Sequence, residues 1–423
     1  MGITKINPLL KQLCPHIFRN IYLSQLSGCR IAIDVSILFI AYWSPSLKMV
    51  LDKTNLADEE PDRDLIIENW IDMVVNFMIN KMLSKGIIPV LVFDGKPPQK
   101  KEDHARKKRK EDRIKAQNEL ARKKYEISQI DPLYRTKEMN KDMYKLYAKV
   151  SFPNPKEDYA KMREIFSSLG IPCLQATGEA EELCSYLCRN NYVNAVYSKD
   201  TDNYVHACPY LITNLDTDYK NKDVKATISM VSEILQSLNI TYEEFVDLCI
   251  LLGCDYNKKL RGVGPENTYK LISQYRRIPY LPDKYDKTEL NYIDCYNIFY
   301  PGNKTYESLC VNPDYKLLLD LNAINTMHET LNKYGQPKII DSIKFIYKSF
   351  QLPSTDFKDN KIAYIIAENR QLYNEMPKYT GGVNVYEGQP QFFNISEEID
   401  LSNINLSKNI NVSNIDLSNL TIP

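Results

Sequence analysis

Short apolar runs that stop at an acidic residue alternate with segments of helical periodicity in the first two thirds of the chain. Three of these runs have the length and composition of buried strands, at residues 29–34, 87–94 and 194–198. The first ends in Asp34, the second ends in Asp94, and the third stops just before Asp200. From 64 to 85, apolar residues recur at helical spacing until Gly86. This alternation predicts an α/β fold, with a mostly parallel central sheet flanked by helices.

Other segments add elements to this prediction. Residues 1–29 indicate a short helix and a turn, and residues 44–63, rich in proline and charge, indicate a loop. Further strands are predicted at 210–213 and 226–229, and further helices at 156–169, 241–252 and 265–275. Thr241 and Glu244 form a capping box at the start of one of these helices.

The last third of the chain is less informative. It is rich in Tyr, Asn and Lys, and residues 314–352 and 361–376 predict helices that pack on the core. Residues 399–420 contain a short near-repeat, which indicates either a β-solenoid turn or a low-complexity tail.

Two acid pairs at i, i+2 spacing stand close together in the sequence, Glu179 with Glu181 and Asp200 with Asp202. Either pair alone is more simply explained as a helix-capping or solvated loop-end group. The strand-ending acids change this balance, because the carboxyl ends of parallel strands meet at one edge of a sheet. Carboxylates gathered there would repel one another, and a hard divalent cation with oxygen ligands relieves that repulsion. The pattern therefore predicts a Mg²⁺ or Mn²⁺ site.

The charge of the chain is neutral as a whole but strongly basic in one segment. Residues 96–124 contain thirteen Lys or Arg and five Asp or Glu, a net charge of +8 in a chain of formal net charge zero. A charge run is usually a solvated helix face. Because this run follows Asp94 directly, it also fits a track for a phosphate backbone that leads to the acidic site.

A second candidate for phosphate contact follows the helix at 241–252. The segments GCDY (253–256) and LRGVGP (260–265) indicate tight turns between two helices. Such a turn exposes backbone amides to one phosphate strand, although the same pattern also fits a plain helical hairpin.

Several classes of protein are not indicated. The ten cysteines form no CxxC pair or zinc-like cluster, so reduced thiols are expected. The first residues show neither a signal peptide nor a myristoylation pattern, and no apolar run has membrane-spanning length.

Taken together, the motifs resemble the flap endonuclease/XPG family of structure-specific 5′ nucleases. The matching blocks stand in family order over residues 1–280: MGI at the start, IAIDVS, PVLVFDGKPP, GEAEEL, SKDTD, FVDLCILLGCDY and RGVGP. The composition, with 30 Tyr, and the diverged last third look most like the poxviral members.

The resemblance implies a PIN-like 5′-nuclease core with a basic helical arch and a helix–two-turn–helix element. It divides the chain into an N-terminal nuclease half (1–95), the arch (96–150), an internal nuclease half (151–280), a mostly helical extension (281–398) and the near-repeat tail (399–423).

The resemblance also implies a site that holds two Mg²⁺ or Mn²⁺ ions. Its ligands would be seven carboxylates: Asp34, Asp94, Glu179, Glu181, Asp200, Asp202 and Asp255. Asp94 and Asp200 would act in catalysis with Lys101 and Lys108, which take the positions of the family's phosphate-contacting Lys and Arg. DNA contacts are implied at Gly2, Lys96, Lys101, Arg106, Lys108, Arg109, Arg261, Gly262 and Gly264, and a K⁺ site at the carbonyls of Lys259, Leu260 and Val263.

The chain departs from the family pattern in three places. Lys108 replaces the family's Arg, and a lysine offers a point charge in place of a planar fork. The family's base-stacking aromatic is Ile40 here, so either Phe39 or Tyr42 substitutes or stacking is weaker. No convincing sliding-clamp peptide is present.

The expected function is a Mg²⁺-dependent 5′-flap endonuclease and 5′→3′ exonuclease that acts on branched or nicked double-stranded DNA. The resemblance places it in the host cytoplasm at sites of viral DNA replication, with viral replication proteins as candidate partners. The alternatives are a four-way-junction resolvase of the same superfamily and a catalytically silent DNA-binding scaffold, although a scaffold would have no need of the acids.

Overall fold

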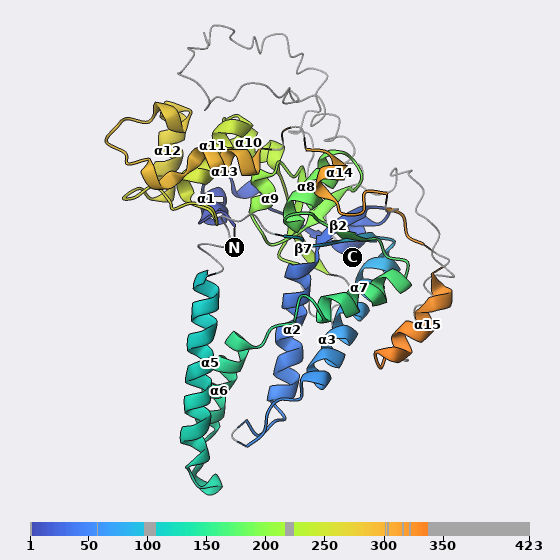
Figure 1. Cartoon of the computed structure of the whole chain (residues 1–423). Coiled ribbons are helices and arrows are strands. Elements are labelled where there is room, and N and C mark those ends of the chain that lie inside the picture. Colours follow the sequence, from blue (N-terminus) through green and yellow to red (C-terminus); the bar gives the residue numbers. More distant parts are fainter. Residues whose placement is uncertain are drawn as a thin grey trace, which may run out of the picture. The chain divides into compact units, whose positions relative to one another are not determined.

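A seven-stranded mixed sheet forms the centre of the protein in the computed structural model (Figure 1). The structure describes residues 2–56, 58–96, 107–215, 224–300, 302, 304–314, 317–320 and 323–336. The strands are β1 (Arg19–Tyr22), β2 (Arg30–Asp34), β3 (Ile88–Phe93), β4 (Cys173–Gln175), β5 (Ala195–Tyr197), β6 (Tyr210–Thr213) and β7 (Lys225–Met230). Their order across the sheet is β1-β7-β6-β5-β2-β3-β4. The run from β6 to β4 is parallel, whereas β7 is antiparallel to both β6 and β1, which confirms the predicted α/β class.

The central strands are buried along their length, as expected for parallel strands covered on both faces. All six residues of β3 are buried, and so are the last four of β2. The register pairs Ile33 with both Leu91 and Tyr197, so that β2, β3 and β5 end almost level. Two strands were not predicted, because β4 has only three residues and β1 is largely exposed, so neither gives a clear periodic signal.

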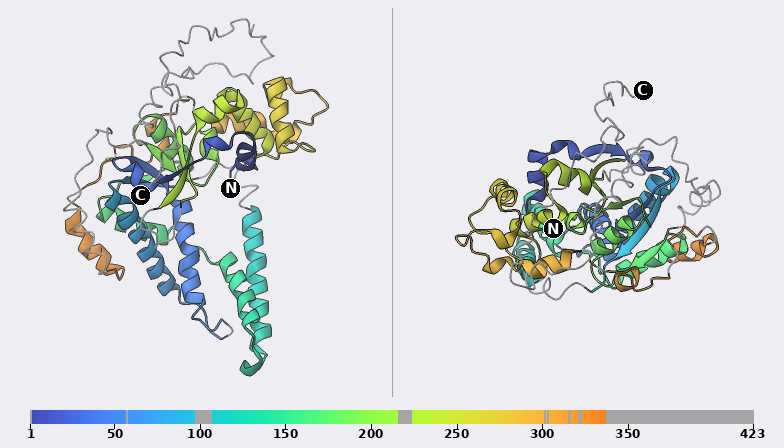
Figure 2. Two further views of the ribbon diagram at one scale, coloured as in Figure 1. Left: turned by 180° about the vertical axis from the view of Figure 1, so that it is seen from behind. Right: turned by 90° about the horizontal axis from the view of Figure 1, so that it is seen from above.

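The helices of the described residues fall into several groups (Figures 1 and 2). They are α1 (Ile6–Leu13), α2 (Val35–Leu51), α3 (Arg63–Phe77), α5 (Lys107–Ser128), α6 (Lys137–Val150), α7 (Asp158–Ser168), α8 (Ala180–Arg189), α9 (Asp202–Val205), α10 (Val231–Leu238), α11 (Tyr242–Leu252), α12 (Pro265–Tyr275), α13 (Tyr292–Phe299), α14 (Tyr306–Leu309) and α15 (Ile324–Lys333). Helix α8 packs against β2, β3 and β5, while α2 packs against α3, β2 and β3. None of the described helices is long and apolar enough to cross a membrane.

The loop predicted at 44–63 is wrong over its first part, because helix α2 extends into this range. The helix continues to Leu51 despite Pro45, and the loop begins only at Asp52. Proline removes one backbone hydrogen bond from a helix interior. Burial of Leu47, Val50 and Leu51 offsets this loss, which the local sequence alone does not reveal.

Helices α5 and α6 form an antiparallel hairpin that contains most of the basic segment (Figure 1). Its far end is tied to the loop after α2. Arg135 Nη1 donates to both carboxylate oxygens of Asp58 at 2.7 Å. Lys124 pairs with Glu60, and Tyr147 Oη donates to the second oxygen of Glu60 at 2.7 Å. The hairpin is therefore attached to this loop through both of its helices and the turn between them.

The C-terminal part packs on the rest of the fold through three helices of the described residues. Helix α13 lies against α11, α14 against α8, and α15 against α7. Helix α15 falls within the predicted helical range 314–352. The predicted helix at 361–376 and the near-repeat at 399–420 lie outside the described residues.

Candidate active site

Asp34 stands at the end of the central strand β2, between the ends of β3 and β5. Its side chain is buried and caps helix α2, because Oδ1 accepts a hydrogen bond from Ser36 N at 3.1 Å. Its other oxygen, Oδ2, accepts from Ser198 Oγ at 3.3 Å. A carboxylate that was predicted from a strand end thus also begins the helix that follows.

Asp94 follows β3 and is fixed from both sides. Its Oδ1 accepts from Ala180 N at 2.9 Å, the first amide of α8, and its Oδ2 accepts from Ser36 Oγ at 2.5 Å. The next residue, Gly95, donates its amide to Gly178 O at 2.7 Å. A Cβ at Gly95 would lie 2.1 Å from Ala176 O, so the chain passes this point only with glycine.

Glu179 and Glu181 enter the site from the start of α8. Glu179 occupies the N-cap position and Glu181 is buried in the first turn, where the helix dipole favours negative charge. Glu179 Oε2 accepts a hydrogen bond from Tyr256 Oη.

Asp200 and Asp202 lie in the tight segment that joins β5 to α9. Asp200 Oδ1 accepts from Asp202 N at 3.1 Å. The chain start packs against this segment, because Ile3 N donates to Thr201 Oγ1 at 2.8 Å. A Cβ at Gly2, whose φ is +87°, would lie 2.2 Å from Asp200 Oδ1. Gly2 is therefore in direct contact with a predicted ligand.

Asp255 lies in the turn after α11. Asn257 organises this turn: its Oδ1 accepts from Cys254 N at 2.8 Å, and its Nδ2 donates to Ile250 O at 2.8 Å. Thr4 N donates to Gly253 O at 2.8 Å, which ties the chain start to the same turn.

The electrostatics of these groups show that the carboxylates share one region. Burial raises the pKa of Asp34 well above its ordinary value, and the nearby charges of Asp94 and Asp200 raise it further. Burial likewise raises the pKa of the Tyr256 hydroxyl, to which the charge of Glu179 adds, followed by the charges of Asp202 and Glu181. The Cys184 thiol joins the two sets, since its pKa is raised by burial and then by Asp34, Glu181 and Asp94.

The donor set fits a hard divalent cation, because it consists of carboxylate oxygens that repel one another. Within the described ranges, no three His, Cys, Asp or Glu side chains are gathered closely enough to hold an ion as they stand.

Most of the predicted phosphate contacts in the basic segment cannot be placed. Lys101 and Arg106 lie outside the described residues, as do the side chains of Lys108 and Arg109, whose backbone belongs to α5. Lys96 is exposed beside the site, and its amide donates to Thr177 O at 3.0 Å.

The predicted helix–two-turn–helix is formed by α11 and α12. Gly262 has a φ of +72°, and Gly264 is the N-cap of α12. Arg261, whose side chain is 73% exposed, pairs with Glu289 at 2.7 Å.

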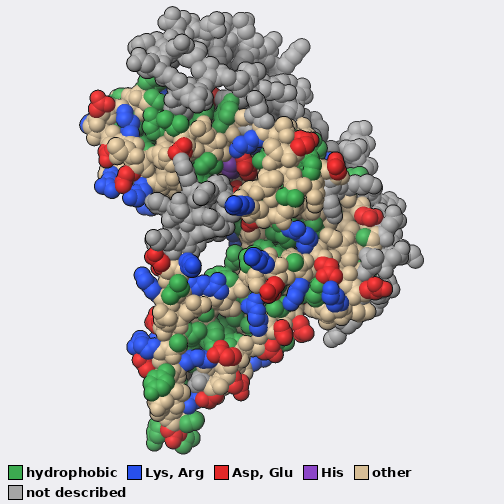
Figure 3. Space-filling view, viewed as in Figure 1, with side chains coloured by type: hydrophobic (Ala, Val, Ile, Leu, Met, Phe, Trp, Pro, Cys, Tyr) green, Lys and Arg blue, Asp and Glu red, His purple; other side chains and the backbone are tan. Residues whose placement is uncertain are grey.

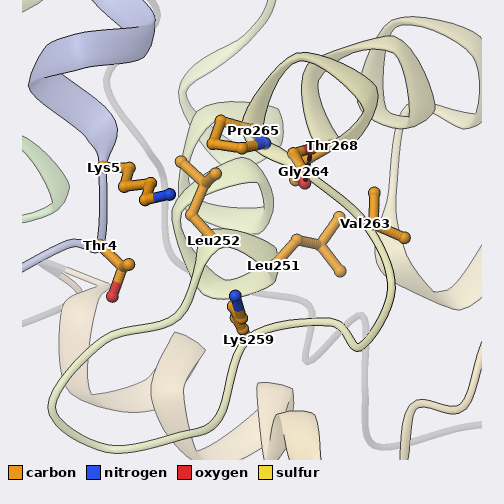
Figure 4. Close-up of a pocket in the computed structure, with 9 residues that line it drawn as sticks. All are labelled: Thr4, Lys5, Leu251, Leu252, Lys259, Val263, Gly264, Pro265 and Thr268. Atoms are coloured by element: carbon orange, nitrogen blue, oxygen red, sulfur yellow. Dashed lines mark hydrogen bonds between the residues drawn. The ribbon is translucent and has the colours of Figure 1, made fainter.

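A small cavity of about 70 Å³ lies beside this turn (Figure 4). The ammonium groups of Lys5 and Lys259 point into it, next to the start of α12 at Pro265 (Figure 4). Two positive charges and a helix N-terminus favour an anion in the cavity itself. The K⁺ site at the carbonyls of Lys259, Leu260 and Val263 stays a prediction.

The two candidate substitutes for the stacking aromatic are wrong. Phe39 is fully buried among other aromatic rings, with its centroid 5.2 Å from that of Trp70, and Tyr42 is also buried. Ile40 is the exposed residue, at 38%. The side chain presented at this position is therefore aliphatic.

Three residues of the site were not singled out from the sequence: Ser36, Tyr256 and Lys5. Ser36 and Tyr256 stand within two residues of Asp34 and Asp255, inside motifs that were noted for their acids. Lys5 gives no local signal, because only the fold brings the chain start to the turn before α12.

Comparison with known proteins identifies the fold as PIN-like and the class as a nuclease. Two family models match the chain, the XPG N-terminal domain over residues 1–116 and the XPG I-region over residues 170–255. The flap endonuclease 1 of Entamoeba histolytica is 32% identical over 295 residues, which is 68% of this chain and 72% of the relative. That of Enterocytozoon bieneusi is 32% identical over 286 residues, 66% of this chain and 71% of the relative. The chain therefore belongs to the flap endonuclease/XPG family of structure-specific nucleases, which confirms the resemblance.

Solved structures support the fold. Flap endonuclease-1 from Methanococcus jannaschii superposes with a TM-score of 0.52 at 22% identity, covering 80% of this chain and 98% of that one. A catalytic core of Rad2 in complex with a DNA substrate gives a TM-score of 0.53 at 18% identity, covering 82% and 100%. At these identities the likeness concerns the arrangement of sheet and helices.

Proposed function

We propose that this nuclease is a Mg²⁺- or Mn²⁺-dependent endonuclease that cuts 5′ flaps in DNA and also has 5′→3′ exonuclease activity. One observation supports this most directly: carboxylates from widely separated segments, from Asp34 and Asp94 to Asp200 and Asp202, share one region at the ends of the parallel strands. The relatives that resemble the chain are flap endonucleases, which favours a 5′ flap as the substrate.

The seven carboxylates would hold two divalent ions. Bound there, the ions would supply a hydroxide nucleophile near neutral pH and stabilise charge on the scissile phosphate. The protein's own part is to fix the ligands. Asp94 is held by Ala180 N and Ser36, and Gly2 closes the site against Asp200.

DNA would be held on both sides of the site. Lys110, Arg113 and Lys115 on α5 are exposed, and Lys and Arg side chains are frequent on this face of the molecule (Figure 3). Lys5 and Lys259 offer a second cationic position at the start of α12 (Figure 4). Phosphate contacts of this kind position a duplex without reading its sequence.

The biological setting is inferred from composition. A chain rich in Tyr, Asn and Lys with a diverged last third would fit a poxviral member of the family. On this basis we place the enzyme in viral DNA replication, repair and recombination in the host cytoplasm, with viral replication proteins as candidate partners.

The test is cleavage of matched 5′-flap, nicked, gapped, overhang and four-way-junction substrates in Mg²⁺. We expect cutting at the flap, and loss of cutting in Asp94→Ala with DNA binding retained. Preferential cutting of the junction by a dimer would identify a resolvase instead. Failure to cut any substrate would refute the nuclease assignment of these carboxylates.

A further inference from the structure

A tyrosine outside the carboxylate set is bonded to one of its members. Tyr256 Oη donates to Glu179 Oε2, across a separation of 77 residues in the chain. Tyr256 is 7% exposed, and Glu179 occupies the N-cap position of α8. The tyrosine hydroxyl therefore fixes one oxygen of this carboxylate.

The ring of Tyr256 is itself held by the C-terminal part of the chain. The edge of Phe299, at the end of α13, packs against it with centroids 5.6 Å apart and an interplanar angle of 72°. Phe299 is fully buried and makes a second edge contact with His206, with centroids 5.7 Å apart. Asn257 also donates to Leu290 O at 2.9 Å, which attaches the turn to the segment before α13.

We propose that Tyr256 is a positioning residue that orients Glu179 for metal binding, and that α13 takes part in the site through Phe299. The inference rests on the proposed metal-dependent nuclease. Without the hydroxyl, Glu179 would sample other rotamers and lose its fixed direction.

The magnitude follows from the behaviour of groups that orient a metal ligand. Loss of such a group typically costs about 10–100-fold in metal affinity or activity. Tyr256→Phe keeps the ring packed against Phe299 and removes only the hydroxyl. We therefore expect its half-saturating Mg²⁺ concentration to rise about 10- to 100-fold, with DNA binding unchanged.

Two measurements distinguish a role of Tyr256 in orienting Glu179 from a role in the stability of the whole protein. The first is the rise in Tm of the full chain with Mg²⁺ in the absence of DNA. The second is the Mg²⁺ dependence of flap cleavage, in which Tyr256→Phe recovers most of its activity at high Mg²⁺. Phe299→Leu should shift both in the same direction by less, because the edge contact is lost while the apolar volume is largely retained.

Tyr269→Phe is the matched control. Tyr269 Oη donates to Leu238 O at 3.0 Å, so this variant also loses a tyrosine hydrogen bond. Its Mg²⁺ dependence should equal that of the wild type. If Tyr256→Phe lowers Tm but leaves the half-saturating Mg²⁺ unchanged, Tyr256 is only structural and the inference is refuted. If the wild type itself neither responds to Mg²⁺ nor cuts DNA, the proposed function fails first, and this inference fails with it.

Discussion

Gly95 offers a sharp test of how the fold positions Asp94. A Cβ at this position would lie 2.1 Å from Ala176 O and 2.5 Å from Thr177 O, both backbone atoms that cannot rotate away. The strand end would have to move, and the bonds from Gly95 N to Gly178 O (2.7 Å) and from Lys96 N to Thr177 O (3.0 Å) would be strained or lost.

The expected cost of Gly95→Ala follows from these contacts. Overpacking costs about 1–3 kcal/mol, and each lost backbone hydrogen bond adds about 0.5–1.5 kcal/mol. We therefore expect the free energy of unfolding to fall by about 4 kcal/mol. Because Asp94 is the preceding residue, its carboxylate would also shift. A displacement of about 1 Å at a reacting centre can cost about 100-fold in rate.

The matched control for this prediction is Gly178→Ala, on the other side of the same crossing. A Cβ there meets only Glu182 Oε2, at 3.9 Å, and neither glycine has a left-handed backbone. In urea unfolding, Gly178→Ala should have the wild-type free energy of unfolding, and Gly95→Ala should have a much lower one. The rate of flap cleavage should likewise be close to wild type in Gly178→Ala and strongly reduced in Gly95→Ala. Equal stability and equal cleavage of the two variants would refute the argument that this backbone contact sets the position of Asp94.

Three further predictions follow from the charges of the described residues. Burial, followed by the charges of Asp94 and Asp200, raises the pKa of Asp34 above its ordinary value of 3.8. The stability that Asp34 contributes is therefore present below pH 3.8 and is lost as the pH rises through the raised pKa. Asp34→Asn should therefore stabilise the metal-free protein at pH 8 more than at pH 4 in urea unfolding; a destabilised variant at pH 8 would contradict this. Mg²⁺ should raise the Tm in proportion to the logarithm of its concentration above Kd, and the stabilisation should reach about 2.7 kcal/mol at 100 times Kd. If the Tm of the double variant Asp34→Asn/Asp200→Asn rises equally, the ion binds at another site. Arg135→Lys should lose the contact with both carboxylate oxygens of Asp58. Limited proteolysis near residues 129–136 should therefore be faster than in the wild type, and the rate of proteolysis should depend less on salt. An unchanged cleavage pattern would show that this contact does not hold the hairpin.

The sequence allowed prediction of the central strands because their burial is nearly continuous. β2, β3 and β5 appear as apolar runs whose ends are acidic, and the α11–α12 pair shows its capping box and its Pro265 start. β1 and β4 were missed because they are short, and their pairing is set by distant strands. The continuation of α2 past Pro45 depends on burial against other elements, which local propensity does not contain.

The sequence indicated the acids of the candidate site but not the residues that hold them. Acidic residues at strand ends and helix starts are visible in a sequence, because they interrupt apolar patterns. Ser36 and Tyr256 act through partners 58 and 77 residues away, which only the fold reveals. The prediction of a stacking residue was wrong for the same reason. Phe39 and Tyr42 are aromatic, but the fold of the helix buries both side chains in the core.

The placement of helix starts explains how the fold tolerates several carboxylates in one region. Asp34 accepts from an amide in the first turn of α2, Asp94 from the first amide of α8, and Asp200 from the first amide of α9. A helix N-terminus carries the equivalent of about half a positive charge, so three of them offset only part of the negative charge. The pKa of Asp34 is raised by burial first and then by the remaining repulsion from Asp94 and Asp200. Backbone amides, together with the hydroxyls of Ser36 and Ser198, therefore supply the hydrogen bonds that hold Asp34 and Asp94 at the ends of their strands. Neutral donors of this kind fix the carboxylates without pairing them with a lysine or arginine.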